Sequence, residues 1–310
     1  MTGTVQVEQR GNVLLATIAN PPYALMDRDI VVELFKLVAR ADSDPTVGGV
    51  VLTGAHPTRF LAHFDVRLIL GSAESSPRIG PQALRRAMTA ISAAVKVPKA
   101  GALLERSPAA GLLAMMRMHG LMKAIQSSSA VWIAALNGDT GGGGCELSLA
   151  CDQRFMADGD FFIAQPEIFL GFPPGAGGTQ RLTRLLGASK ALRICLGGEP
   201  MTPHEAMELG LIDRVVAPKA LLDEAIAEAA RLGKRPKHAI GAVKRAIHQG
   251  GSTTLDEGLR IEASEFLAAI GTPDSIAAQK AYVKRTKELG DLPVSDRALI
   301  KKVIQNGKFF

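Results

Sequence analysis

Cysteine is scarce in this chain of 310 residues, and the spacing of the cysteines does not favour a disulfide bond or a shared metal ion. Cys145, Cys151 and Cys195 make an odd count with no C-x-x-C pair, which argues against a disulfide framework or a structural zinc site. The six histidines include no H-E-x-x-H motif and no pair at ligand spacing. We therefore expect no metal site.

Long apolar runs are also lacking. The uncharged run at residues 124–138 has about fifteen residues and includes several polar side chains, whereas a membrane-spanning helix needs roughly twenty apolar residues. The N-terminal segment has no basic patch followed by an apolar stretch, as a secretory signal would have. We expect a cytoplasmic protein that does not span a membrane.

Aromatic residues make up only 5% of a chain with a net charge of +6. A basic chain can bind nucleic acid or a small ligand that carries phosphates, and the shortage of rings for base stacking disfavours nucleic acid. The basic segments 231–249 and 280–290 keep an RNA-binding or scaffold role open as an alternative. Solvated helix faces or a cradle for ligand phosphates would explain them equally well.

The hydrophobic period predicts an α/β alternation over the first half of the chain. Two strands joined by a tight turn open it, and Asp27 is placed to cap the helix that follows. A buried strand running into a glycine-rich turn and a second helix comes later. The expected elements are strands at 4–9, 13–19, 47–54 and 130–138, and helices at 28–41 and 143–152.

Two other parts of the chain have a mainly helical hydrophobic pattern. Residues 66–128 read mainly as helices and predict a helical cover, and almost everything after about residue 200 has a helical period bounded by glycine or proline. We therefore divide the chain into an α/β core at 1–200, with a helical insertion near 66–128, and a helical region at 201–310.

Four consecutive glycines at 141–144 end two residues before Glu146, which lies in an otherwise apolar helix. Such a run is tolerated where the backbone packs very closely or where a ligand approaches it. Glu167 also lies among apolar residues, ahead of a second glycine-rich loop. Either carboxyl alone is explained as helix-terminal or salt-bridged, but together they are typical of an acid/base couple with raised pKa. The glycine spacing does not fit a dinucleotide fingerprint.

These segments resemble the signature blocks of the crotonase superfamily, and of enoyl-CoA hydratase in particular. The blocks occur in order at residues 20–54, 133–152, 165–187 and 196–216. The resemblance implies a spiral of ββα units whose C-terminal helical region packs protomers into trimers or hexamers. It also implies an acyl-coenzyme A substrate, with coenzyme A as part of that substrate and no separate cofactor.

The resemblance further implies a set of site residues. The backbone N–H groups of Phe64 and Gly143 would form an oxyanion hole for the thioester oxygen. Glu146 and Glu167 would hold one water, Glu146 taking its proton and Glu167 supplying a proton to Cα of a 2-enoyl-CoA. The residues implied to contact substrate are Ala62, Asp65, Gly142, Pro166 and Gly175.

The chain departs from the family pattern in three places. His63 stands where the family usually has glycine, Asp139 and Thr140 stand where apolar residues are common, and the 66–128 segment, which covers the acyl pocket in this family, is longer than usual. These departures leave the acyl group open. Isomerisation, thioester hydrolysis and decarboxylation remain alternatives, because they use the same enolate chemistry.

Overall fold

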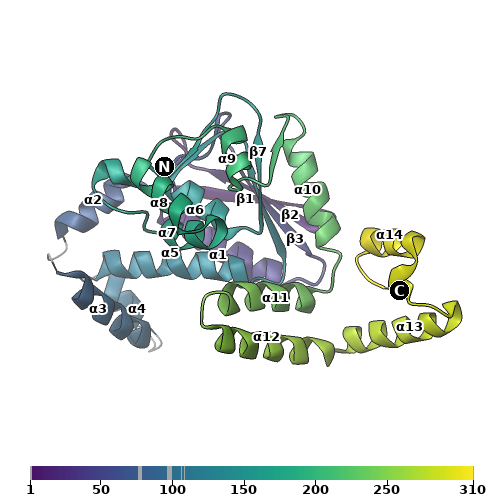
Figure 1. Ribbon diagram of the computed structural model, residues 1–310. Coiled ribbons are helices and arrows are strands. Elements are labelled where there is room, and N and C mark those ends of the chain that lie inside the picture. Colours follow the sequence, from purple (N-terminus) through teal and green to yellow (C-terminus); the bar gives the residue numbers. More distant parts are fainter. Residues whose placement is uncertain (1, 76–78, 96–99, 106, 108, 310) are drawn as a thin grey trace.

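The computed structural model describes residues 2–75, 79–95, 100–105, 107 and 109–309. Its main sheet has six strands in the order β1-β2-β3-β5-β7-β9 (Figure 1). The predicted hairpin is confirmed, since β1 pairs antiparallel with β2, and all other neighbours in this sheet are parallel. The strands are β1 (Thr4–Arg10), β2 (Val13–Ala19), β3 (Gly49–Gly54), β5 (Val131–Leu136), β7 (Gln153–Ala157) and β9 (Arg214–Val216).

A second, smaller sheet contains β4 (Arg59–Leu61), β6 (Asp139–Gly141) and β8 (Ile163–Ala164) in that order, all parallel. Each of the pairs β3–β4, β5–β6 and β7–β8 therefore gives its first strand to the large sheet and its second to the small one. This alternation is a spiral of ββα units. It confirms the predicted fold class.

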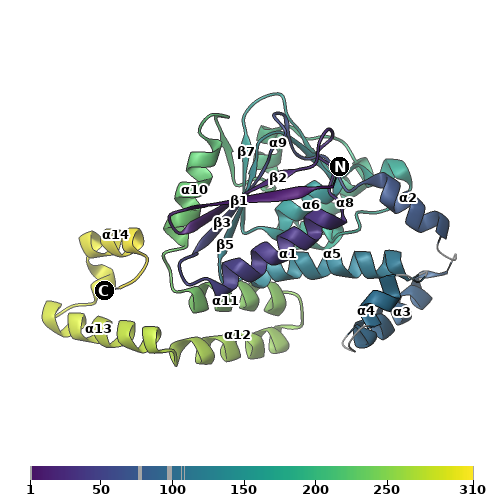
Figure 2. The same ribbon diagram turned by 180° about the vertical axis from the view of Figure 1, so that it is seen from behind.

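Helices cover both faces of the large sheet (Figures 1 and 2). One apolar core joins Leu34 of α1, Met122 of α5 and Trp132 of β5, and a second joins Val51 of β3 and Ile133 of β5 to Ala229 of α10. The helices up to this point are α1 (Arg28–Ser43), α2 (Val66–Ser75), α3 (Pro81–Ala94), α4 (Ala100–Glu105), α5 (Ala110–Ser127), α6 (Gly142–Ala150), the 3₁₀-helix η1 (Pro166–Leu170), α7 (Gly178–Leu186), α8 (Ala188–Gly197), α9 (Pro203–Leu209) and α10 (Leu221–Leu232).

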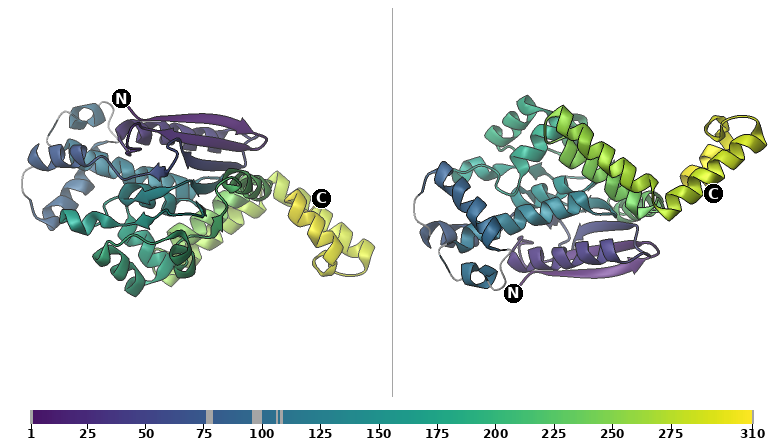
Figure 3. Two further views of the ribbon diagram at one scale, coloured as in Figure 1. Left: turned by 90° about the horizontal axis from the view of Figure 1, so that it is seen from above. Right: turned by 90° about the horizontal axis from the view of Figure 1, so that it is seen from below.

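The remaining helices run along one side of the body and then away from it (Figure 3). They are α11 (Lys237–Arg245), the π-helix η2 (Ala246–Gly250), α12 (Leu255–Ile270), α13 (Pro273–Leu289), the 3₁₀-helix η3 (Pro293–Ser295) and α14 (Arg297–Asn306). The division of the chain near residue 200 stays a prediction. From beyond that point, β9 joins the large sheet as an edge strand and α10 packs on the sheet. In the described ranges, no helix is long and apolar enough to cross a membrane.

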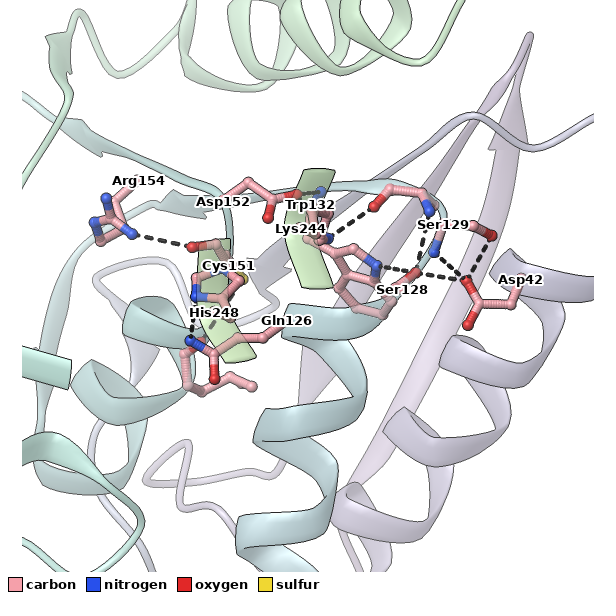
Figure 4. Close-up of polar contacts among 12 residues, drawn as sticks. Asp42, Gln126, Ser128, Ser129, Trp132, Cys151, Asp152, Arg154, Lys244 and His248 are labelled. Atoms are coloured by element: carbon pink, nitrogen blue, oxygen red, sulfur yellow. Dashed lines mark hydrogen bonds and ion pairs between the residues drawn. The ribbon is translucent and has the colours of Figure 1, made fainter. Parts of the chain in front are cut away.

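A buried lysine fastens α11 to the core. Lys244 Nζ donates to the carbonyl of Ala130 and to Asp152 Oδ2, at 2.9 Å in each case (Figure 4). Asp152 Oδ2 also accepts from the N–H of Trp132 at 2.8 Å. A buried cation is stable only when it is paired and hydrogen-bonded in this way, so these contacts fix where the C-terminal helices leave the body.

Candidate active site

Glu146 lies on α6, the helix that follows the second strand of a ββα unit. Every residue of α6 is buried, and the Glu146 side chain is 3% exposed. The Gly178 N–H, at the start of α7, donates to Glu146 Oε1 at 2.7 Å. Burial raises the pKa of Glu146 to about 7, because the charged form loses its hydration, while the Gly178 hydrogen bond opposes the rise. The carboxyl is thus poised to exchange a proton near neutral pH.

Glu167 lies on η1 and faces the start of α6. A Cβ atom placed on Gly142 would be 2.9 Å from Glu167 Oε1, so the glycine leaves room for this carboxylate. Gly142 also has a φ of +45°, which favours glycine. Burial raises the pKa of Glu167, and its charge contributes to the raised pKa of Glu146. The structure therefore brings the two predicted carboxyls together at one site.

Gln165 is a polar neighbour of Glu167 to which the sequence analysis assigned no role. It is 1% exposed, and in the amide orientation that satisfies its hydrogen bonds, Nε2 donates to Glu167 Oε2 and Oε1 at 3.0 and 3.1 Å. The only sequence signal for it is a polar residue directly before Pro166, at the start of η1. Gln165 holds the Glu167 carboxylate in one orientation.

The two predicted oxyanion donors also lie side by side. Phe64 follows β4 and Gly143 is in the first turn of α6, and a Cβ atom on Gly143 would be 3.1 Å from Phe64 N. Within the part of the chain that the structure describes, the Phe64 N–H donates to no protein acceptor. First-turn N–H groups of a helix likewise have no intrahelical partner. Two donors next to two carboxyls can stabilise negative charge that develops on a carbonyl oxygen.

The other predicted contact residues surround this centre. The Ala62 carbonyl accepts from the Gly141 N–H at 2.8 Å, the Pro166 Cδ lies 3.7 Å from a Cβ placed on Gly141, and the Gly175 carbonyl accepts from His119 Nε2 at 2.7 Å. Asp65 is engaged by Arg67, whose Nη2 lies 2.7 Å from Oδ2 and which holds the pKa of that carboxyl below its ordinary value. Their contacts with substrate stay a prediction.

The polar residues Asp139 and Thr140 are used by the fold. Asp139 Oδ1 accepts from the Phe162 N–H at 3.1 Å, and the fully buried Thr140 donates through Oγ1 to the Leu61 carbonyl at 2.7 Å. These bonds connect β6 to the segment before β8 and to β4. These bonds account for a polar residue at both positions, so neither position requires a substrate with a polar acyl group.

His63 directly precedes the Phe64 donor. Its Nδ1 lies 2.8 Å from the Phe64 carbonyl oxygen, which only accepts, so Nδ1 carries the proton and donates. Its backbone is ordinary, since among the described non-glycine residues only Ala24 has a positive φ. The turn that presents the Phe64 N–H therefore forms with histidine in place of glycine.

Replacement of His63 by glycine is expected to leave kcat/KM within about tenfold of wild type, because the proposed donor is the backbone N–H and not the imidazole. Steady-state kinetics on a 2-enoyl-CoA would measure this. A loss of more than about a hundredfold, in protein with an unchanged thermal midpoint, would make the imidazole itself a participant in turnover.

Comparison with known proteins shows which protein family this chain resembles in sequence and fold. A model of the enoyl-CoA hydratase/isomerase family matches residues 101–289. A probable enoyl-CoA hydratase of Rhizobium meliloti is 32% identical over 286 residues, covering 92% of this chain and 96% of that protein. A crotonyl-CoA hydratase of Syntrophomonas wolfei is 30% identical over 270 residues, covering 86% and 90%. The crystal structure of an enoyl-CoA hydratase from Bacillus anthracis superposes with a TM-score of 0.70 at 26% identity, covering 91% and 96%.

Proposed function

Because the chain belongs to the enoyl-CoA hydratase/isomerase family, we propose that it adds water across the double bond of a 2-enoyl-CoA thioester. The observation that carries this function is the pairing of Glu146 and Glu167, two buried carboxyls with raised pKa, beside the N–H groups of Phe64 and Gly143. Each partner in this group has a task in hydration.

The thioester carbonyl oxygen accepts from the Phe64 and Gly143 N–H groups. When water attacks Cβ, electron density moves to this oxygen and an enolate forms, which the two preplaced donors stabilise more than they stabilise the ground state. Glu146 orients the water and takes its proton, and Glu167 supplies a proton to Cα. The charges of the two carboxyls are coupled, so the pair acts as one unit.

Both carboxyls are needed for hydration, whereas isomerisation of a double bond needs only one to move a proton. The Gly178 N–H on Glu146 and the Gln165 amide on Glu167 hold the two carboxyl groups in separate, fixed positions. This arrangement favours hydration over isomerisation. Coenzyme A enters as part of the substrate, and the chemistry uses no metal.

A spectrophotometric assay with crotonyl-CoA is expected to show hydration, with kcat/KM falling as pH drops through about 7. The reason is that Glu146, whose pKa is raised to about 7, accepts a proton only when ionised, and it is protonated below that pH. Absence of turnover across a panel of 2-enoyl-CoA chain lengths would contradict the proposed function. Turnover of 3-enoyl-CoA alone would favour the isomerase.

We also propose that the protein works as a homotrimer or hexamer, in the cytoplasm, in fatty-acid β-oxidation. The support for assembly is α12, which has no buried residue and exposes Leu255, Phe266 and Leu267 by 60% or more. Large apolar side chains gathered on one helix that buries none of its residues form a surface typical of a protein interface.

Light scattering at micromolar concentration is expected to give at least three times the chain mass of 32.7 kDa. Replacing Phe266 and Leu267 together by serine is expected to shift the particle towards smaller species, because it removes apolar area from the proposed interface. A wild-type protein that scatters as a monomer would contradict the proposed assembly.

A further inference from the structure

A cavity of about 580 Å³ opens between α5, α7 and η2. Lys123 and His119 line it from α5, Arg181 and Arg184 from α7, and His248 from η2, while no acidic side chain lines it. We call this space the basic cavity. It takes no part in the proposed hydration steps.

The positive charges of the basic cavity have no carboxylate at ion-pair distance among the residues that the structure describes. In the described ranges, no Asp or Glu forms an ion pair with Lys123, Arg181 or Arg184. Burial lowers the pKa of Arg181, the charge of Glu146 opposes this shift, and the like charge of Arg184 adds to it. Cations held together in this way, without a carboxylate in direct contact, repel each other and attract an anion.

The side chains that line the basic cavity also keep hydrogen-bond donors available to a ligand. Arg181 Nη2 donates to Gln126 Oε1 at 2.9 Å, and Gln126 Nε2 donates to His248 Nδ1 at 3.2 Å (Figure 4 shows the second bond). Burial lowers the pKa of His248, so the neutral ring accepts at Nδ1 and carries its proton on Nε2. Lysine, arginine and this N–H are all donors, which suits a ligand made of acceptors.

The same residues hold the loop that positions Glu146. His119 Nε2 donates to the Gly175 carbonyl at 2.7 Å and Arg181 Nη1 to the Ala176 carbonyl at 3.1 Å. Two residues further on, the Gly178 N–H donates to Glu146. The loop at 174–178 therefore has the basic cavity on one side and the catalytic carboxyl on the other.

We propose that the basic cavity binds a small phosphate-type dianion and that the bound anion lowers turnover through the 174–178 loop. A phosphoryl group matches the cavity because arginine and lysine donate to its oxygens in charge-assisted bonds. The negative charge opposes that of Arg181, which favours the ionised form of Glu146. Only this effect on turnover rests on the proposed hydratase activity.

Titration calorimetry with inorganic phosphate, at an ionic strength held constant with sodium chloride, tests the binding. We expect saturable binding to the wild-type chain, weakened roughly tenfold or more by Arg184→Gln and by Lys123→Gln, since each removes one charge-assisted partner. Arg193→Gln is the matched control, because Arg193 is an exposed arginine of the neighbouring α8, outside the cavity. Absent saturation, or equal affinity in all variants, would overturn the proposal.

Free coenzyme A provides the second arm, because its phosphates share the same chemistry. We expect it not to displace inorganic phosphate, and we expect the KM for crotonyl-CoA to stay within about twofold in Arg184→Gln. Displacement by coenzyme A would make the cavity part of the substrate site and would overturn a separate anion site.

The third arm measures kcat/KM at pH 7 with saturating phosphate against chloride of equal ionic strength. We expect a fall of about twofold or more in wild type and in Arg193→Gln, and a clearly smaller fall in Arg184→Gln, which binds phosphate about tenfold more weakly. An equal effect in all three would contradict the coupling through the loop. If the protein hydrated no enoyl-CoA, the calorimetric result would still decide whether the cavity binds the anion.

Discussion

Replacement of Glu146 by glutamine is expected to lower kcat for hydration by ~10²–10⁴, the usual contribution of a positioned acid or base, with little change in KM. Glutamine keeps the size of the side chain and an oxygen that accepts from the Gly178 N–H, but it cannot take a proton. Stopped-flow or steady-state hydration of crotonyl-CoA measures the loss.

Glu167→Gln is expected to give a loss in the same range, and the double variant to fall far less than the product of the two. Removing either carboxyl already disables the pair, so the effects are not additive. Glu208→Gln, at an exposed position on α9, is the matched control and should retain full turnover. An isomerase would respond strongly to only one of the two substitutions, most directly at Glu167.

Near wild-type hydration by Glu146→Gln, in protein whose thermal midpoint is unchanged, would contradict the assigned mechanism. The thermal control matters because Glu146 is 3% exposed, and a change there can also alter packing. Measuring activity and thermal midpoint on the same preparation would distinguish a catalytic loss from a loss caused by unfolding.

The second large effect is expected for stability, from Gly144→Ala. A Cβ atom on Gly144 would lie 2.2 Å from the Leu61 carbonyl oxygen and 2.5 Å from Thr140 Oγ1, which itself donates to that carbonyl. Neither neighbour is the free end of a flexible side chain, so β4 and α6 would have to separate. Overpacking of this kind costs about 3 kcal/mol or more.

A loss of that size is expected to lower the thermal midpoint by roughly 5 °C or more, measured by circular dichroism or calorimetry. Gly80→Ala is the matched control, because a Cβ atom there meets nothing within 4 Å, and its midpoint should change by less than about 2 °C. A Gly144→Ala protein as stable as wild type would show that the two elements can separate at little cost.

Three of the four glycines before Glu146 thus have different reasons to be glycine. Gly144 is small because the backbone of β4 packs against α6, whereas Gly142 makes room for the Glu167 carboxylate and Gly143 for the space beside the Phe64 N–H. The sequence left close packing and ligand approach as alternatives. The structure shows close backbone packing at Gly144, and at Gly142 and Gly143 it shows the approach of the Glu167 carboxylate and of the Phe64 N–H.

The sequence by itself determined the fold class and most of its elements. Local period and capping predicted the opening hairpin, the helix after Asp27 and the glycine turn into α6, because such features depend on residues close together in the chain. The ordered family blocks supplied the site residues. Their spacing placed Glu146 and Glu167 on different elements without showing that the carboxyls meet.

Only the tertiary structure decided what surrounds each of these groups. The Gly178 donor of Glu146, the Gln165 amide on Glu167 and the approach of Phe64 to Gly143 join elements far apart in the sequence. The basic cavity likewise gathers α5, α7 and η2. Burial and charge at these points depend on distances between elements, which local sequence patterns do not contain, so the raised pKa of Glu146 arises from the packing of the whole fold.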